Sequence, residues 1–166
     1  MLMQESDSRM PMVCVGFAFQ KGRFRIAALE HTAAGIHITA SRAVPVDPDL
    51  PYPELMDRYV SHFRSVKEEF KPRIVAARQS WESNQVDAAV FQITPMGLLG
   101  YIAHNDAVSF RGYTPQALRQ PTPFGLSKGT NPLAAVDGQF GVHPPHWDDM
   151  QKYAVLVAWR AIRETP

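Results

Sequence analysis

A nearly continuous apolar stretch near the start of the chain, residues 13–19 (VCVGFAF), limits what this sequence can fold into. The stretch mixes β-branched and aromatic residues, which is the pattern of a central strand covered on both faces. The rest of the chain must therefore supply elements that cover this strand from two sides.

The segments that follow predict two further strands joined by tight turns. Residues 20–22 carry a turn signal, and residues 23–29 then alternate between two faces, as in a half-buried strand. After a second turn at residues 33–35, residues 36–44 predict a third strand. The three strands are expected to form an antiparallel meander.

The pattern changes after a proline-rich linker at residues 45–53, where helix and central strand are both excluded. Apolar residues recur every three or four positions across residues 54–70, which predicts an amphipathic helix. A short buried strand is expected at residues 73–77. A strand, a helix and a strand in this order imply parallel pairing with a right-handed crossover.

The second half of the chain predicts a second helix at residues 80–105, which Pro95 should kink and in which Gly97 and Gly100 would allow close approach of a neighbour. A fifth strand is expected at residues 107–110. The remaining segments are a short helical turn from Thr114, a loop at residues 120–132, a short helix at residues 133–140 and a closing helix. This order predicts an α/β fold with a mixed five-stranded sheet, a three-strand antiparallel meander plus two parallel strands, flanked by helices.

The closing helix begins at an acidic turn formed by Asp148 and Asp149. Asp is favoured at a helix start because its carboxylate accepts hydrogen bonds from free backbone N–H groups and suits the positive end of the helix dipole. An acidic turn that opens a buried helix is also how several metal-dependent nucleases supply a ligand. The residues alone leave both interpretations open.

Composition sets broad limits on organisation and location. A length of 166 residues fits one domain, expected at residues 12–166 after a flexible N-terminal lead of residues 1–11. The lead has no apolar core of a signal peptide, and no window approaches a membrane span, so we expect a cytoplasmic protein without a membrane partner. The single cysteine, Cys14, excludes an internal disulfide and a multi-cysteine zinc site. A net charge of +1 argues neither for nor against a nucleic-acid partner.

Several short segments follow the motif order of one nuclease superfamily. They are Val15-Gly16-Phe17-Ala18, Ile74-Val75-Ala76-Ala77-Arg78, the kinked helix of residues 88–103, residues 109–115 running into Tyr113-Thr114-Pro115, Ser127-Lys128-Gly129, and Asp148-Asp149-Met150-Gln151-Lys152. In this order they resemble the ribonuclease H-like superfamily, and within it the RuvC-like Holliday-junction resolvases, over residues 13–163. The resemblance implies a dimeric nuclease that cuts branched DNA with two Mg²⁺ or Mn²⁺ ions held by carboxylates.

The catalytic positions depart from that family's pattern. The resemblance places Ala18 where an Asp is expected, Arg78 where a Glu is expected, Asp148 on a conserved acid, and Gln151 where the second acid of the closing helix belongs. One acid of four remains, with Asp149 as a neighbour that could substitute. We therefore expect no metal and no catalytic residues, and hypothesise that Arg78 fills the emptied site and pairs with Asp148 or Asp149.

An active enzyme with relocated ligands is the alternative. Glu30, Glu82 and the acidic pair Asp148 and Asp149 would then converge to bind Mg²⁺ or Mn²⁺. His143 and His146 flank the acidic turn, but ordinary loop histidines are expected, because no metal-binding spacing accompanies them. Of the tryptophans that could stack bases, which are Trp81, Trp147 and Trp159, the last is expected to pack in the core.

The expected function is that of a catalytically inactive RuvC-like domain that binds nucleic acid or acts as an assembly module in a DNA-processing, mobile-element, phage or defence system. Contacts to a duplex or branched DNA backbone are expected from Lys21, Arg23, Arg25, Arg111, Arg119 and Lys128. The helix with Gly97 and Gly100 is a candidate homodimer surface. The alternatives are a metal-dependent endonuclease and an adaptor that binds protein partners without nucleic acid.

Overall fold

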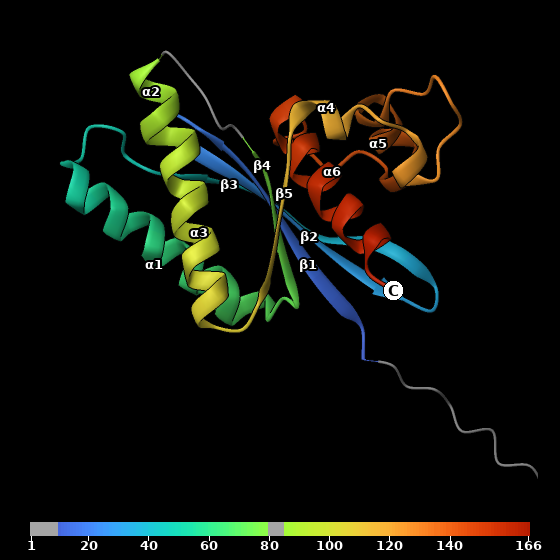
Figure 1. Ribbon diagram of the computed structural model, residues 1–166, viewed down its shortest axis with the longest axis horizontal. Helices are drawn as coiled ribbons and strands as arrows, with labels where there is room; N and C mark the ends of the chain where they lie inside the picture. Colours follow the sequence, from blue (N-terminus) through green and yellow to red (C-terminus); the bar gives the residue numbers. More distant parts are fainter. Residues whose placement is uncertain (1–9, 80–84) are drawn as a thin grey trace, which may run out of the picture.

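The structure is a computed structural model that describes residues 10–79 and 85–166. A five-stranded sheet lies between two groups of helices, with α1 and α3 on one side and α4, α5 and α6 on the other (Figure 1). The strand order is β3-β2-β1-β4-β5. The apolar stretch at residues 13–19 lies within the middle strand, as predicted.

The sheet has the predicted mixed topology. Its strands are β1 (Met12–Gln20), β2 (Arg23–Thr32), β3 (Gly35–Pro45), β4 (Ile74–Arg78) and β5 (Ser109–Tyr113). Strands β1, β2 and β3 pair antiparallel, whereas β4 pairs parallel with both β1 and β5. The parallel pairs require crossovers, and α1 (Tyr52–Phe70) supplies the first of them.

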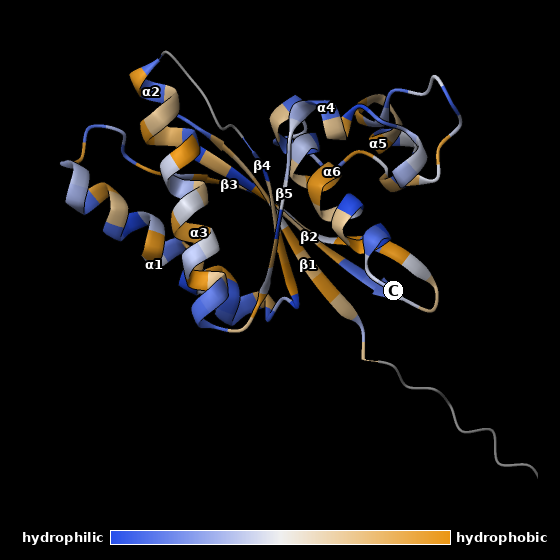
Figure 2. Ribbon diagram, in the orientation of Figure 1, coloured by the Kyte–Doolittle hydropathy of each residue, from blue (hydrophilic) through white to orange (hydrophobic). Residues whose placement is uncertain are grey.

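Alternate residues of β1 supply two separate cores. Val15, Phe17 and Phe19 point to the layer of α1 and α3 (Thr94–Asn105), where Phe17 meets the edge of the Phe63 ring. Cys14 and Ala18 point to the opposite layer, where α6 (Asp149–Glu164) packs. Figure 2 shows the hydrophobic central strands between the two layers. Because α6 carries Ala, Val, Leu and Trp along its buried side, it covers the strands at close range.

The second helix differs in detail from its prediction. It begins with a single turn, α2 (Val86–Ala88), passes through a π-helical segment, η1 (Ala89–Ile93), and continues as α3. The predicted start at residues 80–84 lies outside the described residues. The irregularity stands just before Pro95, where the Thr94 hydroxyl donates to the Ala89 carbonyl at 2.9 Å. The π segment lies directly before the proline and is an irregularity of the kind that accompanies helix kinks.

The remaining elements are short. They are α4 (Pro115–Leu118), a 3₁₀ turn η2 (Thr122–Phe124) and α5 (Pro132–Phe140). Strand β5 begins at Ser109 rather than residue 107, because Ala107 takes a left-handed backbone conformation that a strand cannot contain.

The segment Val86–Asn105 is long and apolar enough to cross a membrane by length and composition alone, and 33% of it is buried. The sequence-based expectation that no window approaches such a span is therefore wrong for this helix. A core helix passes the same test, and this one buries Met96, Leu99 and Ile102.

Gly16 sets the distance between β1 and α6. A Cβ atom at this position would lie 1.9 Å from the carbonyl oxygen of Ala154 and 3.0 Å from the Cβ of Ala158. The close neighbour is helix backbone, which cannot move aside as a flexible side chain can. Packing of α6 on the central strand therefore requires glycine here.

Replacing Gly16 by alanine is expected to lower the free energy of unfolding by roughly 1–3 kcal/mol or more, because α6 must shift outward. Urea denaturation followed by circular dichroism measures this change. Gly138→Ala in α5 is the matched control, since its added Cβ meets nothing within 4 Å, and it should leave stability equal or slightly higher. A Gly16→Ala protein as stable as the wild type would contradict the close contact.

Candidate functional site

The candidate site lies where the carboxyl end of β1 meets the start of α6. In the β1–β2 hairpin, Ala18 pairs with Arg25, so both residues project toward α6. Ala18 is fully buried, and its methyl group leaves room for the long side chain opposite. The family's first catalytic position therefore adjoins a guanidinium group.

All three nitrogens of the Arg25 guanidinium donate hydrogen bonds. Its Nη1 donates to Asp148 Oδ1 at 2.9 Å and its Nη2 to Asp148 Oδ2 at 2.8 Å, which makes a two-pronged ion pair. Its Nε donates to Gln20 Oε1 at 3.0 Å, and Nη1 also reaches the His146 carbonyl at 3.3 Å. Only 2% of the Arg25 side chain is exposed. Such charge-assisted paired hydrogen bonds are among the stronger polar contacts in proteins.

Asp148 has two structural roles at once. Besides binding Arg25, its Oδ1 accepts from the Gln151 backbone N–H at 3.0 Å and so caps α6. Partial burial acts to raise the pKa of Asp148, but the Gln151 N–H and the Arg25 guanidinium outweigh it and hold the pKa below its usual value. The predicted N-cap is confirmed, and the carboxylate stays ionised at neutral pH.

Gln151 is fully buried one turn into α6. Its Nε2 donates to the Ile26 carbonyl at 2.7 Å, while its Oε1 is buried without a hydrogen-bond partner. A neutral amide therefore occupies the position at which the resemblance expects a second helix carboxylate.

The hypothesis that Arg78 pairs with Asp148 or Asp149 is wrong. The Arg78 guanidinium lies over the ring of Tyr153, 4.2 Å from its centroid, and its buried Nε has no partner. The cation that neutralises Asp148 comes from β2 instead of β4. Asp149 lies exposed in the first turn of α6.

These residues do not fit a two-metal centre. Of the four positions, Ala18 and Gln151 are neutral, Arg78 is cationic, and the Asp148 carboxylate is held by Arg25 on both oxygens. Two divalent cations need several carboxylates, and a guanidinium within hydrogen-bond distance of the single available one would repel them. Within residues 10–79 and 85–166, no three His, Cys, Asp or Glu side chains are grouped to hold a metal.

Glu30, the relocated ligand of the alternative that lies in the described part of the chain, is far from the acidic turn. Glu30 pairs with Val13, five residues along β2 from Arg25, so it lies roughly 17 Å away at the other end of the hairpin. The His143 ring hydrogen-bonds the Phe140 carbonyl at 2.8 Å and contacts the ring of Trp147. Glu82 and Trp81 lie outside the described residues.

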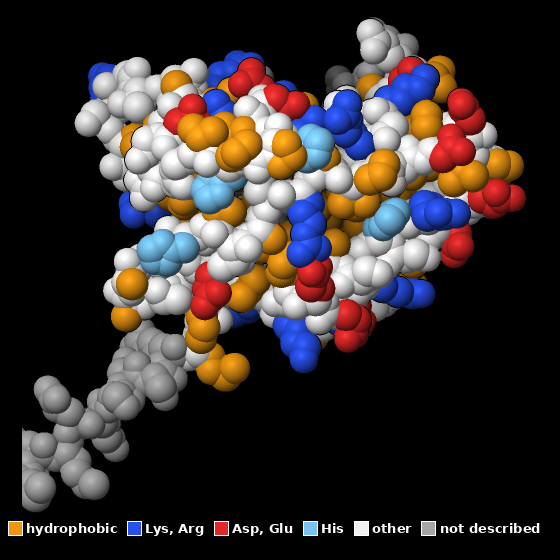
Figure 3. All heavy atoms as spheres, turned by 180° about the vertical axis from the view of Figure 1, so that it is seen from behind, with side chains coloured by type: hydrophobic (Ala, Val, Ile, Leu, Met, Phe, Trp, Pro, Cys, Tyr) orange, Lys and Arg blue, Asp and Glu red, His pale blue; other side chains and the backbone are white. Residues whose placement is uncertain are grey.

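The basic residues expected at a DNA backbone separate into two groups. Arg25, which was expected to contact DNA, is buried in its ion pair with Asp148. Lys21 is exposed but pairs with Asp87 at 3.2 Å. The other predicted contacts, which are Arg23, Arg111, Arg119 and Lys128, are exposed. On the face seen in Figure 3, Lys and Arg side chains alternate with Asp and Glu and form no large basic patch.

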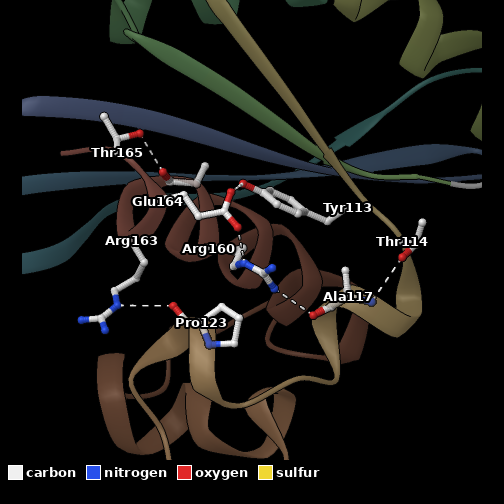
Figure 4. Close-up of polar contacts among 9 residues, drawn as sticks. Tyr113, Thr114, Ala117, Pro123, Arg160, Arg163, Glu164 and Thr165 are labelled. Carbon is white, nitrogen blue, oxygen red and sulfur yellow. Dashed lines mark hydrogen bonds and ion pairs between the residues drawn. The ribbon is translucent and has the colours of Figure 1, made fainter.

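A polar cluster at the carboxyl end of α6, which sequence reasoning missed, ties the helix to β5 and α4 (Figure 4). Arg160 donates to Glu164 at 2.6 Å and to the Ala117 carbonyl at 2.8 Å, and Glu164 accepts from the Tyr113 hydroxyl at 2.8 Å. Burial, together with this carboxylate, raises the pKa of Tyr113. The cluster joins β5, α4 and α6.

Two of the tryptophans pack within the protein. Trp159 is buried against Phe124 and Phe140, as expected. The Trp147 indole N–H donates to Asp137 at 2.6 Å. Neither ring lies free on the surface.

Neither family models nor the sequences of curated proteins match this chain. Among solved structures, Thermus thermophilus RuvC is 18% identical with a TM-score of 0.72, covering 92% of this chain and 94% of that chain. The same protein in complex with a Holliday junction substrate gives 16% identity and a TM-score of 0.70, over 92% and 93% of the chains. The yeast mitochondrial Holliday junction resolvase Ydc2 gives 12% and 0.66, over 95% and 81%. The chain therefore has the predicted RuvC-like, ribonuclease H-like fold.

The Arg25–Asp148 pair predicts an unequal response to loss of either partner. Asp148→Asn keeps a capping side chain but leaves a buried guanidinium without its carboxylate, so we expect a loss of about 3–5 kcal/mol of unfolding free energy. Arg25→Met should cost less, because the side chain of Asp148 is 56% exposed and water can solvate it. Urea denaturation of both variants at pH 7 measures the difference.

The same ion pair predicts that the stability of the protein depends on pH in the acidic range. The folded-state pKa of Asp148 is depressed, so its contribution to the free energy of unfolding is fully present when the pH is above the unfolded-state pKa of about 3.9. That contribution is lost as the pH falls through the folded-state pKa. The stability gap between wild type and Asp148→Asn should therefore shrink as pH falls below about 4. A gap that stays constant from pH 7 to pH 3, or equal costs for the two variants, would contradict this assignment.

Proposed function

We propose that this chain is a RuvC-like domain that binds branched DNA without cutting it and serves as an assembly module in a DNA-processing system. The observation that carries the proposal is the ion pair between Arg25 and Asp148, at 2.8 and 2.9 Å, beside Ala18. It neutralises with a guanidinium the one acid that remains at the family's catalytic positions.

The proposed loss of cleavage follows from charge. A two-metal nuclease needs carboxylates that bridge both ions, while one ion activates water and the other stabilises the leaving oxygen. Here Asp148 is the one acid left at the four expected positions, and releasing it for a metal would leave the buried Arg25 guanidinium without its carboxylate. The energetic cost of that exchange opposes metal binding.

DNA binding is supported by the fold and by the exposed cations. Thermus RuvC, which has this fold, has been solved with a Holliday junction substrate. The exposed residues Arg23, Arg111, Arg119 and Lys128 are available for phosphate contacts. With a net charge of +1 and interspersed acids, we expect moderate affinity that weakens steeply with salt.

A mobile four-way junction incubated with the protein and Mn²⁺ should be bound and left intact. Binding is measured by fluorescence anisotropy at several salt concentrations, and cleavage by denaturing gel. A variant with Arg111, Arg119 and Lys128 changed to glutamine should bind about tenfold or more weakly and with a shallower salt dependence. Arg64→Gln, which changes an exposed cation on α1, is the matched control.

Two results would contradict the proposal. Cleavage that disappears in Asp148→Asn would establish an active nuclease. Absence of binding even at low salt would remove the DNA-binding role and favour a protein adaptor.

A homodimer through α3 is a further part of the proposal. Tyr101 on α3 is 65% exposed, Val86 at the start of the preceding α2 is 78% exposed, and a Cβ at Gly97 would meet nothing within 4 Å. Light scattering after size exclusion should give a dimer that Tyr101→Glu dissociates, whereas Tyr52→Glu on α1, another exposed tyrosine, should not. A monomer at all concentrations up to about 100 μM, far above the Kd of a stable dimer, would contradict this surface.

A further inference from the structure

A cavity of about 360 Å³ lies between α6 and the segments around α4 and α5. This volume falls within the range of roughly 300–1,000 Å³ typical of small-molecule sites. Its lining residues are Pro115, Leu118, Arg119, Pro121, Gly129, Thr130, Asn131, Leu133, Tyr153 and Leu156. The cavity is separate from the Arg25–Asp148 pair, although α6 contributes to both.

The walls of the cavity are fixed by hydrogen bonds. The Thr114 hydroxyl caps α4 by accepting from the Ala117 N–H at 3.2 Å, and Arg160 donates to the Ala117 carbonyl at 2.8 Å. Arg163 reaches the Pro123 carbonyl at 3.5 Å (Figure 4). On the other side, Asn131 caps α5 by accepting from the Leu133 N–H at 3.1 Å. The segments on both sides are therefore held in place before any ligand binds.

The lining combines a flat aromatic ring, aliphatic surface and positive charge. Tyr153 is half-buried, and the Arg78 guanidinium stacks on its ring. Arg119 is exposed where it borders the cavity, and Thr130 supplies a hydroxyl group. In the described part of the chain, neither Arg78 nor Arg119 forms a salt bridge with a carboxylate. A ligand that suits this lining has an aromatic ring system and an anionic group.

We propose that this cavity binds a nucleotide, with its base against Tyr153 and Leu133 and its phosphate at Arg119. The assignment rests on the proposed DNA-binding function where the nucleotide is an unpaired residue of a DNA strand. A free mononucleotide has the same chemistry and is the other source. Stacking of a base on an aromatic side chain supplies affinity without sequence preference.

The test compares a duplex with the same duplex carrying one unpaired nucleotide, by fluorescence anisotropy with the full chain. We expect about tenfold tighter binding of the bulged DNA, which Tyr153→Leu reduces to the level of the duplex. Tyr52→Leu, an exposed tyrosine on α1, is the matched control and should keep the preference. A second variant, Leu133→Phe, fills the cavity and should weaken bulge binding while Tyr153 stays in place. Thermal melting checks that each variant is folded.

Free thymidine monophosphate is titrated in parallel and followed by the amide signals of Thr130 and Tyr153 in NMR spectra. Saturable changes in the chemical shifts of these amides support nucleotide binding in the cavity, even if no DNA binds. Equal affinity for bulged and plain duplex, together with no shifts, overturns the inference while leaving DNA binding intact. Failure to bind either DNA defeats the proposed function, and the mononucleotide titration then decides the inference alone.

Discussion

A buried guanidinium needs a carboxylate, and this requirement connects the two halves of the molecule. Arg25 belongs to the β1–β2 hairpin, and its partner Asp148 stands 123 residues later at the start of α6. Because Asp148 also caps the helix through the Gln151 N–H, the ion pair fixes where α6 begins relative to the sheet. Gly16 then allows α6 to lie directly on β1. The packing of α6 against β1 and β2 depends on these two contacts.

The same arrangement is what supports the proposed loss of nuclease chemistry in this fold. Metal ions in such a fold offset the repulsion among clustered carboxylates. In this chain the acids are reduced to Asp148, and a side-chain cation supplies the compensating charge. The pair matters most to Arg25, because the buried guanidinium alone would be an uncompensated charge, whereas water can solvate the half-exposed Asp148.

Much of the fold could be predicted from the sequence, because local patterns determine it. The apolar run of β1, the alternation in β2 and the helical spacing of α1 each report a local environment, and the order of elements then limits the topology.

The partner of Asp148 was missed because it depends on register. The turn at Lys21 and Gly22 brings Arg25 opposite Ala18, and counting back along the hairpin would have indicated it. The family pattern pointed to Arg78 as the partner of Asp148 or Asp149. Its actual stacking on Tyr153 is a tertiary contact that no sequence motif indicates. The cluster of Tyr113, Arg160 and Glu164 likewise joins separate elements.

The most direct test of the central claim is whether the end of β1 can hold a divalent cation. Mn²⁺ is paramagnetic and broadens NMR signals close to a bound ion, so its addition can be followed at the amides of Ala18 and Gln151. We expect sub-millimolar Mn²⁺ to leave both signals unchanged in the wild-type protein. Selective broadening of both signals at low Mn²⁺, abolished by Asp148→Asn, would show that the carboxylate leaves Arg25 for a metal and would contradict the account.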